Sequence, residues 1–247
     1  MHECSAARAR RRRDRPTCRV MPITSKASAE QRCYICAEPI CPGDGDIDHV
    51  VPVGLFNPED RQNLIKLPAH KDCNRSFSKD DEYFRLCMTA ASSHDDKAKK
   101  VWRGPVMRGF HRPESQGFKA SVMANLIPAD IRTEAGLYLS SGDAMLQDAQ
   151  RIRRVVNKIV RGLYVHRTGK ILPADWPVSS DLMNPAKLRP FVKLLNIRFF
   201  SVGNETFLYG SKHMEEDHRE ALFWLVFYRS IHFWGYTGTA VRSLLFS

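Results

Sequence analysis

The sequence contains no apolar run of roughly 18 residues or more, so a membrane-spanning helix is not expected. It also lacks the apolar part of a secretion signal near its first residue, where arginines are concentrated instead. An oxidising compartment is therefore not implied, and we expect a cytoplasmic protein. Under those conditions the seven cysteines are more often metal ligands than disulfide partners, provided that they lie at short spacings.

Acidic residues are in the minority, with 27 against 38 lysines and arginines, and the net charge is +11. The stretch from Met1 to Val20 holds seven arginines and two acidic residues, a charge of +5, so the rest of the chain keeps +6. A basic excess of this size favours a polyanionic partner, and nucleic acid is the first candidate. The 247 residues can form one large domain or two small ones around a substantial core.

The composition divides the chain into four segments. Residues 1–29 form a basic tail that is expected to be disordered, because "RARRRRDR" repels itself and offers nothing to bury. This tail could contact phosphates, or Met21 could begin a shorter natural chain. Residues 30–92 are dense in Cys, His, Asp and Asn, residues 93–141 form a connecting region, and residues 142–247 form a C-terminal α+β domain.

Periodicity and turn chemistry predict the main elements. Apolar pieces on both sides of residues 42–45 indicate a hairpin, and Ser78 with Asp81 three residues later indicates a capping box that starts a helix. A long apolar stripe at helical spacing predicts a helix over 142–165, with Asp143 as its cap.

The remaining stretches give weaker patterns. Residues 104–117 are typical of a loop, whereas "IRFFSV" and "TFLYG" around Gly203-Asn204 indicate a hairpin. The aromatic stretch that follows predicts one or two buried antiparallel strands.

Two short pairs of metal-ligand residues lie within residues 30–92. Cys33 and Cys36 form a C-x-x-C pair, and His70 and Cys73 form an H-x-x-C pair further along the chain. Together they supply four ligands of the types and spacing that tetrahedral zinc requires. We therefore predict a closed structural zinc site that holds together a segment too small to be stabilised by burial alone.

The residues between and after these pairs complete a recognisable pattern. An acid-histidine pair is followed three residues after the histidine by proline. An Asn-Leu pair precedes the H-x-x-C pair, and an asparagine directly follows its cysteine. The chain here resembles the HNH nuclease family, also called the ββα-metal nucleases, over about residues 30–85. The resemblance is carried by Cys33, Cys36, Asp48, His49, Pro52, Asn63, Leu64, His70, Cys73 and Asn74.

The resemblance implies a role for each residue of the pattern. His49 is expected to be the general base, Asp48 and Asn74 to hold a catalytic cation, and Asn63 to keep the loop and the His49 ring in place. Because Asn74 is an amide where other members have histidine, Mg²⁺ or Mn²⁺ is favoured over Zn²⁺ as that cation. The chemistry agrees, since an imidazole is a suitable base at neutral pH and a hard cation suits the phosphate charge.

The predicted fold is α+β, with an N-terminal zinc-stapled ββα-metal module, then a long helix and a C-terminal region with antiparallel strands. The predicted function is metal-dependent hydrolysis of phosphodiester bonds in nucleic acid, with DNA favoured. The alternative is a zinc-stabilised nucleic-acid-binding protein without catalytic activity. The basic residues expected to contact the phosphate backbone are Lys66, Lys71, Arg75 and Lys79.

Overall fold

The computed structural model describes residues 31–133, 135–183 and 196–239. Contacts group Gln31–Ser247 into one compact unit, separate from Met1–Glu30. The predicted basic tail thus lies outside the described residues. Within them, helices and antiparallel sheets are mixed, as the predicted α+β class requires.

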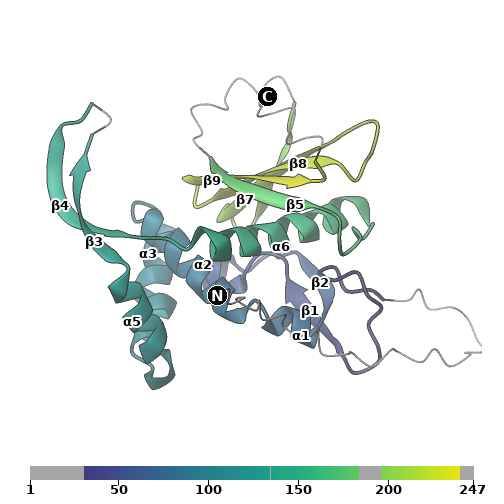
Figure 1. Cartoon of the computed structure of the whole chain (residues 1–247), viewed down its shortest axis with the longest axis horizontal. Helices are drawn as coiled ribbons and strands as arrows, with labels where there is room; N and C mark the ends of the chain where they lie inside the picture. The colour runs from purple at the N-terminus through teal and green to yellow at the C-terminus, as the bar shows by residue number, and fades with distance from the viewer. Residues whose placement is uncertain (1–30, 134, 184–195, 240–247) are drawn as a thin grey trace, which may run out of the picture. The chain divides into compact units, whose positions relative to one another are not determined.

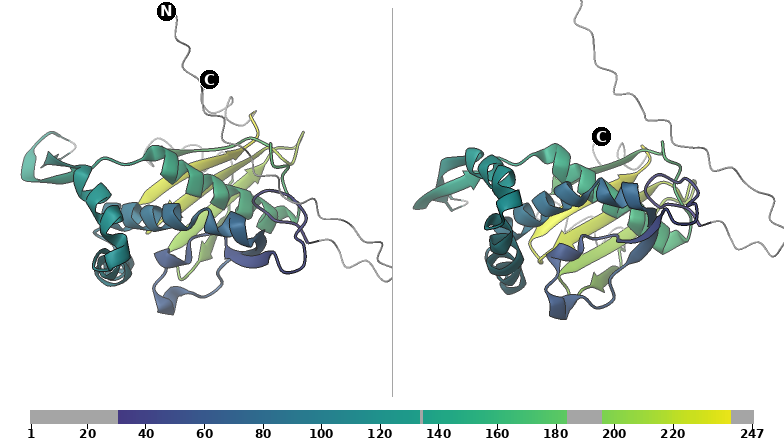
Figure 2. Two further views of the ribbon diagram at one scale, coloured as in Figure 1. Left: turned by 60° about the horizontal axis from the view of Figure 1, so that its bottom comes forward. Right: turned by 90° about the horizontal axis from the view of Figure 1, so that it is seen from below.

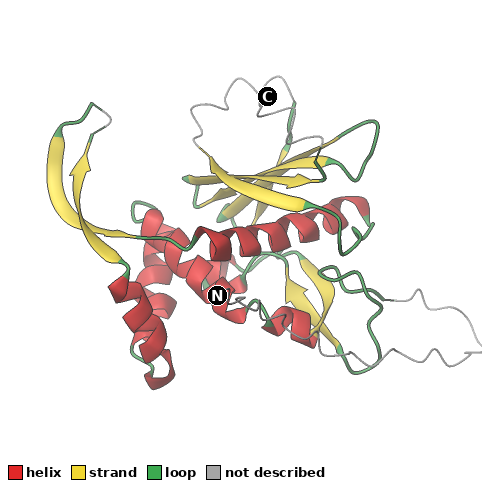
Figure 3. Ribbon diagram, viewed as in Figure 1, coloured by secondary structure: helices red, strands yellow, loops and turns green. Residues whose placement is uncertain are grey.

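The described strands and helices are distributed along the whole unit (Figure 1, Figure 3). The strands are β1 (Gly45–His49), β2 (Lys66–His70), β3 (Leu126–Arg132), β4 (Tyr138–Met145), β5 (Val178–Met183), β6 (Phe199–Val202), β7 (Phe207–His213), β8 (Ala221–Phe227) and β9 (Ile231–Thr237). The α-helices are α1 (Lys71–Arg75), α2 (Ser78–Ala91), α3 (Asp96–Val101), α4 (Met107–Phe110), α5 (Gln116–Ala124) and α6 (Ala149–Thr168).

A five-stranded antiparallel sheet with the order β5-β9-β8-β7-β6 forms the C-terminal part. The hairpin predicted at Gly203-Asn204 is confirmed as the β6–β7 connection, and both residues adopt positive φ angles that glycine and asparagine tolerate. The aromatic stretch forms the two strands β8 and β9. The inner face of this sheet packs against α6, and α2 lies beside α6 (Figure 2).

The hairpin predicted around residues 42–45 is wrong. Among the described residues before this turn, Arg32 and Pro39 form an isolated bridge, because the chain from Cys33 to Ala37 folds into a tight turn. Strand β1 pairs instead with β2, with Gly45 opposite His70 and His49 opposite Lys66. Since α1 follows β2 directly, the order of elements here is strand, strand, helix.

Both predicted helix caps are wrong. Helix α6 begins at Ala149, where the Asp148 side chain accepts bonds from the N–H groups of Gln150 and Arg151, whereas Asp143 lies in strand β4. Helix α2 begins at Ser78 without a side-chain cap, because the chain enters it directly from α1 through an αR residue. The Asp81 carboxylate, which the capping box would use, bonds to Lys158 instead.

The stretch 104–117, predicted as a loop, is largely helical. It includes part of a π-helical turn over Trp102–Val106, then α4, a 3₁₀ turn over Pro113–Ser115 and the start of α5. Pro105 lies inside the π turn, and its missing N–H disfavours a regular α-helical turn at that point. Beyond α5, the β3–β4 hairpin extends away from the sheet and α6 (Figure 1).

One hydrophobic core spans the predicted 30–92 module and the predicted 142–247 domain. It includes Val50, Phe84, Val155 and Phe223, all fully buried. Helix α6 lies at its centre, and two glycines allow close contact on its two sides. A Cβ on Gly162 would lie 2.6 Å from a Val50 methyl, and a Cβ on Gly235 of β9 would lie 2.1 Å from a Val160 methyl.

Candidate functional site

The two predicted ligand pairs come together at the junction of β2 and α1. Cys33 and Cys36 come from the tight turn, His70 ends β2, and Cys73 lies in the first turn of α1. One ligand atom from each of the four residues lies within 4.8 Å of all the others. In a tetrahedral zinc site such atoms lie roughly 3.5–3.8 Å apart, and Sγ of Cys36 lies 3.3 Å from Nδ1 of His70. The cluster could therefore hold a metal ion, and its donor set suits zinc.

Hydrogen bonds around the cluster orient its ligands. Nε2 of His70 lies 3.1 Å from the carbonyl oxygen of Pro39, so this nitrogen donates its proton and Nδ1 keeps its lone pair toward the cysteines. The backbone N–H of His70 donates to Sγ of Cys33 at 3.4 Å. Hydrogen bonds from the Cys36 and Cys73 side chains lower the pKa of Cys33, and contacts with Cys33 and Cys36 raise the pKa of Cys73.

His49 ends strand β1 and is half-buried. Its pKa is lowered by burial and then by the positive charge of Lys66, its partner across the hairpin. The imidazole is therefore neutral at neutral pH and can accept a proton.

Asp48 points to the opposite side of β1 and is buried, with 5% of its surface exposed. Its Oδ2 accepts a hydrogen bond from the Tyr34 hydroxyl at 2.6 Å and lies 3.6 Å from Nζ of Lys158 in α6. Burial raises the pKa of Tyr34, and the negative charge of Asp48 raises it further, so the phenol stays protonated as a donor. A cation-binding role for Asp48 stays a prediction, and the carboxylate already has two partners.

Asn74 contacts a different carboxylate. Its Nδ2 donates to Oδ2 of the exposed Asp46 at 3.0 Å, and this bond lowers the pKa of Asp46. Such an arrangement leaves the amide oxygen of Asn74 available to a cation. The sequence reasoning did not single out Asp46, although strand alternation puts residues two apart on the same face of β1 and could have indicated it.

Asn63 lies in the connection between β1 and β2, is exposed, and has a φ angle of 55°. Asparagine tolerates this left-handed conformation better than most residues, which gives a conformational reason for its presence. Among the described contacts, none joins its side chain to His49, so its role in holding the His49 ring stays a prediction.

The four basic residues predicted to contact phosphate are exposed around β2, α1 and the start of α2. Lys66 lies beside His49 across the β1–β2 pair, and Nζ of Lys71 donates to the carbonyl of Gly43 at 2.6 Å. Lys79 is exposed near the N-terminus of α2, while its carbonyl accepts a bond from Arg151. The charges of Lys71 and Arg75 act on Asp46, and the charge of Lys66 acts on His49.

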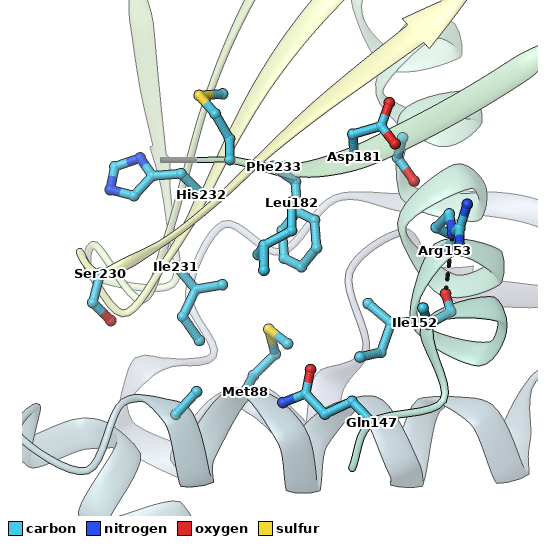
Figure 4. Close-up of a pocket in the computed structure, with 14 residues that line it drawn as sticks. Met88, Gln147, Ile152, Arg153, Asp181, Leu182, Ser230, Ile231, His232 and Phe233 are labelled. Atoms are coloured by element: carbon cyan, nitrogen blue, oxygen red, sulfur yellow. Dashed lines mark hydrogen bonds between the residues drawn. The ribbon is translucent and has the colours of Figure 1, made fainter. Parts of the chain in front are cut away.

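A pocket of about 470 Å³ lies elsewhere, between α2, the N-terminal end of α6, and strands β5 and β9 (Figure 4). Its walls are mainly apolar, with Met88, Ile152 and Phe233 among them, and the polar side chains of Gln147 and Arg153 also line it. None of the predicted site residues is among its described lining residues, so the candidate site lies outside this pocket.

No family model, curated protein or solved structure matches the chain significantly. Among the described helices, none has the length and apolar character needed to cross a membrane.

Proposed function

We propose that the protein is a metal-dependent endonuclease of the HNH type, with a structural zinc ion at Cys33, Cys36, His70 and Cys73. One observation supports this proposal above the others. The four-residue cluster lies where β1, β2 and α1 meet, with His49 at the end of β1 and Asn74 directly after the last ligand, in the first helix after β2. The order strand, strand, helix is the order expected of a ββα-metal module.

Different residues of the candidate site can perform different steps of phosphodiester hydrolysis. The neutral imidazole of His49 accepts the proton of the attacking water, while Lys66, Lys71, Arg75 and Lys79 contact the nucleic-acid backbone. A divalent cation, Mg²⁺ or Mn²⁺, would be held by Asn74 and by a carboxylate of β1. The resemblance to the HNH family assigns this second role to Asp48. When bound, it would neutralise charge that develops on the phosphate.

The proposal is tested by incubating the full chain with supercoiled plasmid, and separately with RNA, in Mg²⁺ or Mn²⁺. Wild type is expected to nick the plasmid, and His49→Ala is expected to lose about 100- to 10,000-fold in rate, which is the usual loss for a missing general base. His94→Ala is the matched control, because His94 is exposed and lies outside the candidate site. Its rate should equal that of wild type.

The alternative function predicts a different pattern in the same assays. A zinc-stabilised nucleic-acid-binding protein would shift labelled DNA or RNA in a gel without cutting either. Absence of cleavage on both substrates, with binding retained by wild type and by His49→Ala, would reject the nuclease and favour this alternative. Cleavage of RNA alone would keep the reaction class and replace DNA as the substrate.

A further inference from the structure

A buried network of four side chains joins the strand that carries His49 to the long helix α6. Oδ2 of Asp48 accepts from the Tyr34 hydroxyl at 2.6 Å and lies 3.6 Å from Nζ of Lys158. The same Nζ donates to Oδ2 of Asp81 at 3.0 Å. Tyr34 belongs to the first zinc knuckle, Asp48 to β1, Asp81 to α2 and Lys158 to α6, so the network connects four separate elements.

The burial of this network is unusual for charged groups. The side chain of Lys158 is 0% exposed and that of Asp48 is 7% exposed. A buried ammonium is tolerated only with close compensating charge, and truncating one member of such a pair leaves the other charge uncompensated. Lys158 therefore fixes the position of Asp48, and with it the end of β1.

The same contacts bear on the cation. A divalent cation bound at Asp48 would lie near the ammonium of Lys158, where two positive charges repel strongly because little water screens them. The Oδ2 atom also already accepts the Tyr34 proton. Asn74, the other predicted cation ligand, contacts Asp46 on the exposed surface.

We propose that Asp48 is not a cation ligand but a buried anchor, through which Lys158 of α6 positions the strand end that carries His49. This inference rests on the proposed function in one respect, namely that His49 is the catalytic base. Lys158 is then a positioning residue, and the C-terminal half of the chain is required for full activity. A displacement of a base by about 1 Å can cost roughly 100-fold in rate, so loss of this anchor should lower the rate strongly.

The test compares Asp48→Asn and Lys158→Met in the full chain with Lys99→Met as the matched control. Lys99 pairs with Asp96 at 2.9 Å on the surface, so this variant also removes a lysine from an ion pair. Zinc content and melting temperature show whether each variant is folded. Three further quantities are measured at a temperature well below every melting transition: Mn²⁺ affinity by electron paramagnetic resonance, and kcat and KM for cleavage.

The inference expects both network variants to bind Mn²⁺ within about twofold of wild type, with kcat lowered at least tenfold and KM unchanged. Lys99→Met should match wild type in all three quantities. Mn²⁺ binding weakened tenfold or more by Asp48→Asn would identify Asp48 as a cation ligand and overturn the inference. Tighter Mn²⁺ binding by Lys158→Met would overturn it too, because the lysine would then be competing with the cation at Asp48.

Lys158→Met could prevent folding, because it leaves the buried Asp48 and the half-buried Asp81 without a cation. The double variant Lys158→Met with Asp81→Asn removes one of those charges and serves in its place. A folded double variant with lowered kcat supports the positioning role. A wild-type kcat in this variant would mean that Lys158 only balances charge, which overturns the role.

Failure of the proposed function is distinguishable from failure of this inference. Wild type that neither cleaves nucleic acid nor binds Mn²⁺ would refute the nuclease. The reaction of His49 with diethyl pyrocarbonate, followed by mass spectrometry, then decides the positioning claim by itself. A rate changed more than fivefold by Lys158→Met, or by the double variant, supports it, and a rate equal to that of Lys99→Met overturns it.

Discussion

The hydroxyl of Tyr228 donates a hydrogen bond of 2.6 Å to the carbonyl oxygen of Leu55, which lies far from it in the sequence. Leu55 follows the stretch that contains His49, and Tyr228 lies in the tight turn between β8 and β9. Both Tyr228 and Arg229 have positive φ angles, which is costly for residues other than glycine. The contact with Leu55 thus helps hold a strained turn and ties the sheet to the candidate site.

Tyr228→Phe should destabilise the protein by about 1–3 kcal/mol, because a buried carbonyl loses its donor. Urea denaturation at neutral pH measures the change. Tyr138→Phe is the control, since the Tyr138 hydroxyl contacts Ser141 on an exposed surface, and a change below about 0.5 kcal/mol is expected. Equal effects for the two variants would contradict a special role for the Tyr228 contact.

Removal of the proposed zinc ion should destabilise the region around β1, β2 and α1, because metal binding and folding are coupled in such small segments. Cys36→Ser is expected to purify with less than one zinc per chain and to melt at a lower temperature, and a strong chelator should lower the melting temperature of wild type. Cys87→Ala, at a buried cysteine of the main hydrophobic core and outside the four-residue cluster, should keep one zinc per chain. A zinc-free wild type that melts like Cys36→Ser would refute the four-ligand assignment.

Gly162→Ala should destabilise the protein by about 1–3 kcal/mol through overpacking. The new Cβ would lie 2.6 and 2.8 Å from the two methyls of Val50, which is fully buried in the core. Gly117→Ala tests the reverse case, because this α5 position has nothing within 4 Å of a Cβ. Helix propensity predicts unchanged or slightly raised stability there, by up to about 1 kcal/mol, in the same denaturation experiment.

His232 should make stability depend on pH. Burial lowers its pKa below 6.5, and its Nδ1 accepts a hydrogen bond from Nε1 of Trp224 at 3.0 Å. The unfolded chain therefore binds more protons than the folded chain as pH falls below about 6.5, so the free energy of unfolding decreases in acid.

His232→Gln keeps an acceptor for Trp224 and removes the titration. The loss of unfolding free energy between about pH 7.5 and pH 5.5 should become smaller than in wild type, although other histidines with lowered pKa retain their share. His94→Gln, at an exposed position, should leave the wild-type dependence intact. An unchanged pH dependence in His232→Gln would show that this histidine is accessible to protons in the folded state.

Local sequence patterns correctly predicted the features that depend only on residues close together in the sequence. The buried face of α6 follows from helical spacing, and the β6–β7 turn follows from Gly203-Asn204. The C-x-x-C and H-x-x-C spacings predicted the residues that form the metal-ligand cluster, because each pair is held by its own short turn. The wrong helix caps have the opposite cause, because the folded chain decides where each helix begins: α6 starts after Asp148, and α2 starts without a side-chain cap.

The pairing of β1 with β2 and the burial of Asp48 could not be predicted from local sequence patterns. Strand β1 pairs with β2 because residues 33–37 fold into a tight turn. The segment just before β1, which is nearer in sequence, is therefore not extended and cannot pair with it. The burial of Asp48 depends on Lys158, which belongs to a helix far along the sequence.

The sequence by itself therefore determined the four residues that could hold a metal ion, the strand that ends in the acid-histidine pair and the apolar stripe of α6. Each of these is a pattern within a short stretch of the chain. Only the tertiary structure decided which carboxylate meets Asn74 and which one is buried against α6. Those choices depend on close contacts such as Gly162 against Val50, and distant segments make such contacts only once the whole core has formed.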